Sequence, residues 1–261
     1  MRLAARAVAN HLGSTADEIR KALPKAQTAL FSVAYGTFEG LNLVAAELKE
    51  FLGRHGRLRA ILDIDRHFTD PFLIDDLYTM PGDVGCKLFG PRIKNPSVLE
   101  SVAFHSKIYY FDDTRDATAI VGSSNLSTGG LIRNYETSIV LHGEIEHPVF
   151  VSLRKIFDDF WGNPNAIDTS LYPKFREAYA IAYAKAKVLN PRPGIPMDIP
   201  LEVEPEVLAE LQQEFGISKE KIIHNTSAYI AGLIAGGLKS IDLTSRTLEI
   251  KFQRGIVNPT N

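Results

Sequence analysis

Residues 104–136, FHSKIYYFDDTRDATAIVGSSNLSTGGLIRNYE, constrain the fold more than any other part of this chain. The segment holds three short apolar runs separated by polar and glycine residues. The first run contains His105 and Lys107, the second ends at Gly122-Ser-Ser-Asn125, and the third carries Asn134 and Glu136. Short apolar runs bounded by turn residues are typical of β-strands. The pattern therefore predicts three neighbouring strands with polar residues at their ends.

The alternation of side chains along a strand predicts which residues share a face. His105 and Lys107 are predicted on one face of the first strand, and Phe104, Ile108 and Tyr110 on the other. In the third strand, one face is predicted to carry Asn134, Glu136 and Ser138. The polar faces converge beside a Gly-Ser loop, which indicates an anion site that contains a nucleophile.

The rest of the N-terminal half alternates between strand and helix patterns. Strands are predicted over residues 28–35, 58–64 and 84–89, and helices over residues 15–23, 41–52, 72–78 and 148–161. The last helix is predicted to bury Val149, Leu153, Ile156, Phe157 and Phe160. This order predicts an α/β sandwich, a mixed β-sheet flanked by helices.

The first 13 residues are predicted to form a short helix, because Leu3, Ala7, Val8 and Leu12 recur at helical spacing. No apolar run here is long enough for a signal peptide, and none in the chain reaches the roughly 18 residues of a spanning helix. Cys86 is the only cysteine, so no internal disulfide is possible. A cytoplasmic protein without a membrane partner is expected.

Composition changes after residue 165 predict three regions. Residues 1–165 form the catalytic domain, residues 166–200 a helix and a proline-rich linker, and residues 201–261 a small, mainly helical C-terminal appendage. The appendage is expected to bind DNA or a partner. Residues 208–238 fit a helix-turn-helix or an ordinary helical hairpin. The net charge of −2 requires any polyanion to meet a local basic patch.

The motif His105-Ser-Lys107, followed by Asp112 and by Gly122-Ser-Ser-Asn125, resembles the HKD signature of the phospholipase D superfamily. The downstream residues resemble the version of this motif found in phospholipase D-like nucleases, which include restriction endonucleases. These residues are Asn125-Leu-Ser127, Gly130-Leu131 and Asn134-Tyr-Glu136. Ten residues separate Asp112 from Ser123, more than is usual in the family, which predicts a longer hairpin. The chain carries one such motif, whereas phospholipases proper carry two.

Phosphodiester cleavage needs a nucleophile, charge stabilisation and a proton for the leaving group. His105 is the predicted nucleophile, forming a phosphohistidine, and Glu136 is predicted to accept the proton of its other ring nitrogen. Lys107 supplies positive charge, while Ser123 and Asn125 donate to the non-bridging oxygens. The scheme uses no metal and no cofactor. A second histidine must act as acid, so one motif per chain predicts a homodimer with a shared active site.

Other polar residues allow two readings each. One interpretation is that basic residues at the rim of the site bind the phosphates of the substrate, and the other is that they belong to an ordinary solvated loop. These residues are Arg66, Lys87, Arg92 and Lys94. The spacing of Asp242, Glu249 and Lys251 resembles a metal-dependent nuclease core. An alternating surface strand over residues 248–252 explains the same residues more simply.

The predicted function is a metal-independent DNA endonuclease of a restriction or defence system, with a possible helicase or specificity subunit as partner. The first alternative is a phospholipid or small-diester hydrolase, which would need a lipid-facing surface. The second is a catalytically silent DNA-binding subunit, which the intact motif disfavours.

Overall fold

The computed structural model describes residues 2–90, 103–189, 240–242 and 249–251. The chain divides into two compact units, Met1–Tyr179 and Ala180–Asn261. An eight-stranded sheet organises the first unit, in the order β1-β7-β6-β5-β2-β3-β4-β8. Its strands are β1 (Leu3–Ala9), β2 (Thr28–Val33), β3 (Arg57–Asp63), β4 (Asp83–Phe89), β5 (Lys107–Asp112), β6 (Asp116–Gly122), β7 (Thr137–Glu144) and β8 (Ala166–Asp168).

The sheet is mixed, as predicted. Strands β2, β3 and β4 run parallel, whereas β5, β6, β7 and β1 each run antiparallel to their neighbours. The helices are α1 (Thr15–Ala22), α2 (Phe38–Asn42), α3 (Ala45–Gly53), α4 (Pro71–Thr79), α6 (Pro148–Trp161) and α7 (Arg176–Leu189), with the shorter turns η1 (Leu23–Lys25), η2 (Gly129–Arg133) and η3 (Thr169–Lys174). The strands predicted over residues 28–35, 58–64 and 84–89 and the helices predicted over residues 15–23, 72–78 and 148–161 are confirmed, whereas the expected helix over residues 41–52 is divided into α2 and α3. The first and third strands predicted within residues 104–136 are shorter than expected. Strand β5 starts at Lys107 and β7 at Thr137, so His105, Asn134 and Glu136 lie in the segments that precede these strands and not on strand faces.

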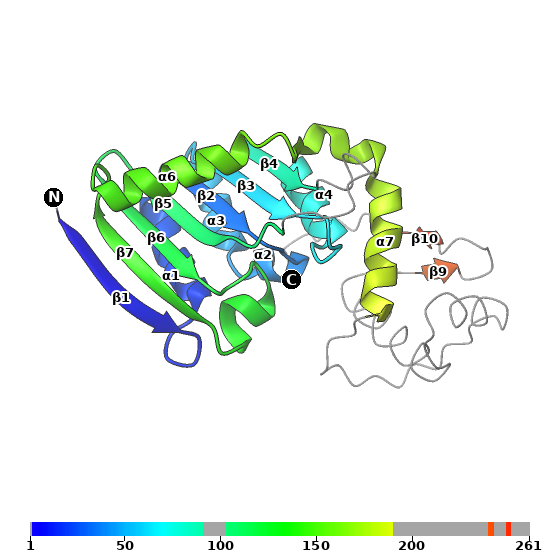
Figure 1. Ribbon diagram of the computed structural model, residues 1–261, viewed down its shortest axis with the longest axis horizontal. Helices are drawn as coiled ribbons and strands as arrows, with labels where there is room; N and C mark the ends of the chain where they lie inside the picture. Colours follow the sequence, from blue (N-terminus) through cyan, green and yellow to red (C-terminus); the bar gives the residue numbers. More distant parts are fainter. Residues whose placement is uncertain (1, 91–102, 190–239, 243–248, 252–261) are drawn as a thin grey trace. The chain divides into compact units, whose positions relative to one another are not determined.

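Helices cover both faces of the sheet (Figure 1). Helices α1, α3 and α4 bury Ile19, Phe51 and Leu73 in one cluster with the β2 and β5 side chains that face them. Helix α6 covers the other face with Phe150 and Phe157. The predicted inner face of α6 was partly wrong, because Ile156 is 39% exposed and Phe150 is buried. The two buried rings are seven residues apart, two helical turns, and this spacing sets the contact line.

Local capping explains where the helices begin. Ser14 accepts a hydrogen bond from the Asp17 backbone and completes a capping box with that side chain, so α1 starts at the residue after Ser14. Asp70 caps α4 in the same manner through the Phe72 amide, with Pro71 at the first helical position.

The N-terminal helix prediction was wrong, since residues 3–9 form the edge strand β1. The strand pairs with β7 from Leu3 opposite Gly143 to Ala9 opposite Thr137. A short helix of this length is marginal by itself, whereas pairing with β7 supplies backbone hydrogen bonds along one side of the whole segment. Tertiary pairing therefore overrides the helical spacing of the apolar residues.

Beyond residue 165, β8 pairs with β4 and belongs to the first unit. In the second unit, β9 (Ser240–Asp242) pairs antiparallel with β10 (Glu249–Lys251), which confirms a strand there. The helix-turn-helix or helical hairpin expected over residues 208–238 lies outside the described residues, and the three-region division stays a prediction. No helix in the described part of the chain combines the length and apolar character needed to cross a bilayer.

Candidate active site

The predicted catalytic residues meet at the edge of the sheet that is formed by strand ends, where β2, β3 and β6 end and where β5 and β7 begin. In the ladders, Val33 at the end of β2 lies opposite Lys107 at the start of β5, and Gly122 at the end of β6 lies opposite Ser138 near the start of β7. Strand β3 runs parallel to β2 and ends at this same edge, at Asp63. The loops that follow β3 and β6 therefore face the segments that precede β5 and β7.

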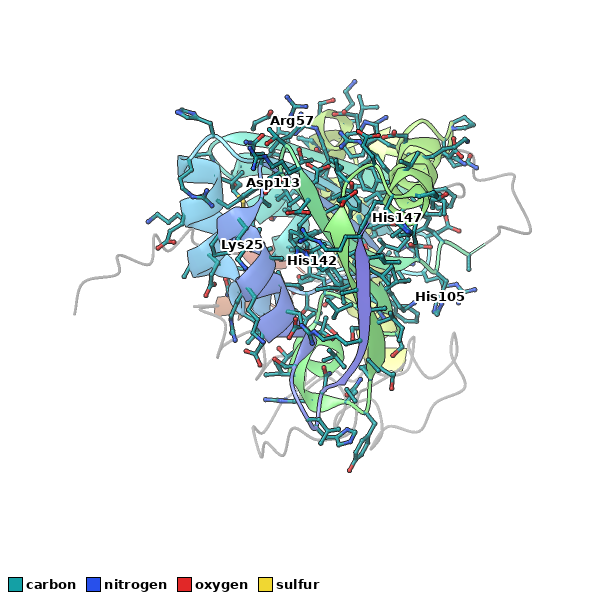
Figure 2. The ribbon with its side chains drawn as sticks, turned by 90° about the vertical axis from the view of Figure 1, so that its left-hand side faces the viewer. Lys25, Arg57, His105, Asp113, His142 and His147 are labelled. Atoms are coloured by element: carbon teal, nitrogen blue, oxygen red, sulfur yellow. The ribbon has the colours of Figure 1, made fainter. Side chains whose placement is uncertain are left out.

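His105 lies just before β5 and is held by Lys107. The Lys107 ammonium is 3.0 Å from His105 Nδ1 and also donates to the His105 backbone oxygen at 3.0 Å. Only 8% of the Lys107 residue surface is exposed, whereas the His105 side chain projects from the surface (Figure 2). This combination places a solvent-accessible imidazole directly over a buried cation.

Electrostatics favour the neutral form of this imidazole. The positive charge of Lys107, partial burial and the charge of Arg66 all lower the pKa of His105. Burial lowers the pKa of Lys107, while the Glu136 carboxylate opposes that shift. A neutral imidazole retains the lone pair that a nucleophile requires.

The contact with Lys107 also fixes the tautomer of the resting ring. A neutral ring whose Nδ1 accepts from an ammonium carries its proton on Nε2. Attack through Nε2 therefore requires the ring to release Lys107 and move its proton to Nδ1. Glu136 was expected to accept that Nδ1 proton, but among the described residues no hydrogen bond joins Glu136 to His105.

Glu136 is instead held by two neighbours. Ser123 donates its hydroxyl hydrogen to Glu136 Oε2, and Asn134 Nδ2 donates to Oε1 at 3.2 Å. The Thr137 amide donates to Ser123 Oγ at 3.1 Å. Ser123 and Glu136 are thus brought together as one polar unit beside the motif, and Asn134 joins them although it was absent from the predicted catalytic set.

Asn125 occupies a more enclosed position, with 8% of its surface exposed. Its Oδ1 accepts a hydrogen bond from the Tyr35 backbone amide at 3.3 Å, which leaves Nδ2 as the donor end. Gly130 makes this packing possible, because a Cβ on Gly130 would lie 2.3 Å from the Asn125 backbone oxygen. The Gly-Leu pair in the motif is therefore explained by close backbone approach.

The loop between Gly122 and Asn125 is supported from below. Tyr109 of β5 donates its hydroxyl hydrogen to the Ser124 backbone oxygen at 3.1 Å. The Ser124 side chain contacts the Thr15 hydroxyl of α1, with 2.9 Å between the oxygens. These buried contacts make the loop a rigid platform for Ser123 and Asn125.

Asp112, the third residue of the motif, does not join the site. It ends β5, the strand that starts at Lys107, and so lies at the opposite edge of the sheet. Its Oδ2 accepts a hydrogen bond from Arg154 of α6 at 2.6 Å. Asp112 therefore fastens α6 to the sheet and does not contact the reacting group.

The predicted rim residues differ in their surroundings. Arg66 is exposed in the loop after β3, and its charge lowers the pKa of His105. Lys87 donates to the Trp161 backbone oxygen at 2.7 Å and lies 5.0 Å from the Trp161 ring centre, so it caps the end of α6. Arg92 and Lys94 lie outside the described residues. A substrate contact stays a prediction for all four.

Asp63 was missed at the sequence level. It is the last residue of β3, is buried, and its Oδ2 accepts a hydrogen bond from the Phe104 amide at 3.2 Å, one residue before His105. A carboxylate that directly follows the apolar run of residues 60–62 was the available signal. Within the described ranges, no three His, Cys, Asp or Glu side chains gather into a metal-binding group.

Comparisons with known proteins identify the family of the chain. The family model described as "Cardiolipin synthase, PLD-like domain" matches residues 19–161. A comparison with curated protein sequences gave no match. Similar solved structures are Nuc from Salmonella typhimurium (14% identity, 64% of this chain and 98% of that chain, TM-score 0.48) and NucT from Helicobacter pylori (13% identity, 64% and 99%, TM-score 0.48).

A third similar structure is phosphatidylserine synthase from Haemophilus influenzae Rd KW20, with 11% identity, 68% of this chain, 46% of that chain and a TM-score of 0.47. The family match covers more than half of the 261 residues and includes every described catalytic candidate. The chain therefore belongs to the phospholipase D superfamily and is an enzyme of the phosphodiesterase type.

Proposed function

We propose that this protein is a metal-independent endonuclease that hydrolyses DNA through a covalent phosphohistidine at His105, within a restriction or defence system. The observation that carries the chemistry is the pair formed by exposed, neutral His105 and buried Lys107. A polymer is the favoured substrate because His105, Ser123 and Arg66 are all exposed at the sheet edge. A long phosphodiester can lie across such an open site.

The proposed reaction has two steps. A ring nitrogen of His105 attacks phosphorus, the bond to the leaving oxygen breaks, and that oxygen takes a proton from an acid. Water then attacks the phosphohistidine, returns one proton to the former acid, and releases the phosphate end and His105. Lys107 and the Asn125 amide stabilise the phosphoryl oxygens, and Glu136 stabilises the ring after it turns away from Lys107.

The acid in this proposal is His105 of a second copy. Each chain supplies one motif, so a two-fold homodimer would place both imidazoles at one phosphate. One ring starts neutral as nucleophile and the other starts protonated as acid, with one proton shared between them. A helicase or specificity subunit would direct the dimer to its DNA, and residues 201–261 are the proposed region for that contact.

A phospholipid or small-diester substrate is the second candidate, and one observation favours it. Leu12 is 85% exposed and Tyr135 is 92% exposed. Tyr135 directly precedes Glu136, and Leu12 follows Asn10, whose backbone amide donates to the Glu136 backbone oxygen. Exposed apolar side chains beside a phosphodiester site suit lipid chains as well as stacked nucleobases.

The test compares three substrates in one buffer: supercoiled plasmid, vesicles of an anionic phospholipid, and bis(4-nitrophenyl) phosphate. Each reaction is run in EDTA and again with added magnesium. The proposal expects plasmid cleavage in EDTA at the rate seen with magnesium, and no phospholipid turnover. Phospholipid turnover with intact plasmid would replace the nuclease proposal with the second candidate. Plasmid cleavage only with magnesium would contradict the metal-independent reaction and favour a metal-dependent nuclease core at Asp242, Glu249 and Lys251.

A further inference from the structure

Asp63 is a buried carboxylate that bonds to two separate loops of the site. It is 5% exposed at the end of β3. Oδ1 accepts a hydrogen bond from the Asp65 amide at 2.7 Å, and Oδ2 accepts one from the Phe104 amide at 3.2 Å. The two oxygens therefore join the loop after β3 to the segment before β5.

The hydrogen bond from the Phe104 amide anchors the residue before the nucleophile. Phe104 is 7% exposed, and its ring lies 5.1 Å from the ring centre of Phe89 and 5.1 Å from that of Phe160. The two rings fix the side chain of Phe104, and Asp63 fixes its backbone. His105 follows directly, so its backbone position depends on this anchor.

The hydrogen bond from the Asp65 amide orders the loop that carries Arg66. Asp65 immediately precedes Arg66, and the Arg66 backbone also bonds to the Asp63 carboxylate. Arg66 is one of the charges that keep His105 neutral. One carboxylate thus sets the positions of a cation and of the imidazole that the cation acts on.

We propose that Asp63 is a positioning residue for the phosphodiesterase reaction, whose ionised carboxylate holds the Phe104 backbone and the Arg66 loop so that His105 meets the scissile phosphate. This role rests on the proposed function of His105 as nucleophile. Asp63 itself does not touch the substrate. Misplacement of a reacting group by about 1 Å can cost about 100-fold in rate, so an anchor one residue away is well placed to control turnover.

Protonation of Asp63 weakens the anchor. Burial, reinforced by the negative charge of Asp65, raises the pKa of Asp63 to about 6, although the amide hydrogen bonds oppose the shift. The Tyr179 phenol of α7 is a further titratable group that the Asp63 charge reaches. A protonated carboxyl has an O–H donor in place of one acceptor oxygen, so it cannot hold both amides equally. The anchor is therefore present above about pH 6 and weakens as the pH falls through that value.

Fold stability is expected to change in the opposite direction. The pKa of Asp63 in the folded protein lies above its unfolded value, so between these values the folded state binds more protons. Its contribution to stability thus grows as the pH falls through about 6, while turnover falls. A residue that only stabilised the fold would not separate these two quantities.

The decisive variant is Asp63→Asn, in which Oδ1 still accepts one amide hydrogen but Nδ2 cannot accept the other. The expected result is a fall in kcat of about 10- to 100-fold with KM changed less than about twofold. The wild-type acid limb should show a protonation near pH 6 in addition to that of His105, and the variant should lack it. Asp76→Asn on α4 is the matched control, because burial also raises the pKa of that carboxyl.

A readout that does not need activity separates this inference from the proposed function. In the wild-type protein, the NMR amide signal of Phe104 should shift with a midpoint near pH 6, and in Asp63→Asn it should not. A wild-type kcat and acid limb in Asp63→Asn, or a Phe104 amide that ignores pH, would overturn the positioning role. Full activity in His105→Ala would overturn the nucleophile assignment instead, whatever the Phe104 signal does.

Discussion

The Lys107 ammonium lies 3.0 Å from Nδ1 of His105, and the same ammonium donates to the His105 backbone oxygen. The buried cation therefore suppresses protonation of the imidazole and orients its ring in the free enzyme. When a phosphate enters, the Lys107 ammonium can donate to the phosphoryl oxygens in place of His105 Nδ1, which would release the ring for attack. One residue would then prepare the nucleophile and stabilise the transition state.

Replacing Lys107 by methionine should raise the pKa of His105. The change removes the positive charge that most strongly lowers that pKa, so the ring will bind a proton at higher pH. The acid limb of the pH–rate profile should move to higher pH, and kcat should fall by about 100-fold or more because a donor to the phosphoryl oxygens is lost. An NMR titration of the His105 ring protons measures the shift directly.

Lys155→Met provides the control for this experiment. Lys155 lies on α6 in an exposed ion pair with Asp159, so its removal should leave the His105 titration unchanged. An unchanged His105 pKa in Lys107→Met would show that the 3.0 Å contact does not persist in solution.

His105→Ala should abolish turnover and leave the fold intact. The side chain is exposed and lies before β5, so no core contact is lost, whereas removal of a nucleophile commonly costs about 1,000-fold or more. Cleavage rate and thermal melting temperature should be measured together. His142→Ala, an exposed histidine near the far end of β7 (Figure 2), should retain full activity. Near wild-type cleavage by His105→Ala would remove the residue from its proposed role.

Asp112→Ala should lower stability without changing the chemistry. The variant leaves Arg154 without its 2.6 Å hydrogen bond and removes a carboxylate that is 5% exposed, a change expected to cost about 1–3 kcal/mol of unfolding free energy. Because Asp112 lies at the opposite edge of the sheet from Lys107, kcat per folded molecule should stay at the wild-type value. Urea unfolding measures the unfolding free energy, and initial rates divided by the concentration of folded enzyme measure kcat.

The double variant Asp112→Ala/Arg154→Ala tests whether the two residues act as a pair. Its loss of stability should be smaller than the two single losses combined. A folded Asp112→Ala protein with a clearly reduced kcat would mean that the third motif residue acts in the reaction after all.

A shared active site predicts how mixed dimers behave. When wild-type and His105→Ala chains are mixed at constant total concentration and allowed to exchange, activity should fall as the square of the wild-type fraction. A mixed dimer lacks either the nucleophile or the acid, so only wild-type pairs turn over. His142→Ala chains mixed in the same way should give no loss. A linear fall with His105→Ala, or an active monomer in sedimentation, would place the acid within one chain.

Much of the fold was predictable because its signals are local. Residues 148–161 form the predicted helix with the predicted bounds, and Asp70-Pro71 begins α4 as expected. Proline, capping side chains and apolar spacing act over a few residues, so they can be read without the rest of the molecule. Residues 3–9 failed for the opposite reason, since their strand exists only because β7 lies beside them.

Most residues of the candidate site were predictable from the sequence for the same reason. His105 and Lys107 are two residues apart, and the loop with Ser123 and Asn125 follows the next strand, so the order of the chain indicated an anion site with a nucleophile. The resemblance to the phospholipase D superfamily implied the phosphodiester chemistry, and the family match confirms that superfamily. Tertiary structure decided which groups cooperate across the sheet. Asp112 is separated from the nucleophile because a strand carries its two ends to opposite edges. Asp63, 41 residues before Phe104, reaches the nucleophile segment because β3 and β5 end and begin at one edge, and only the packed sheet could bring that buried carboxylate to its amide.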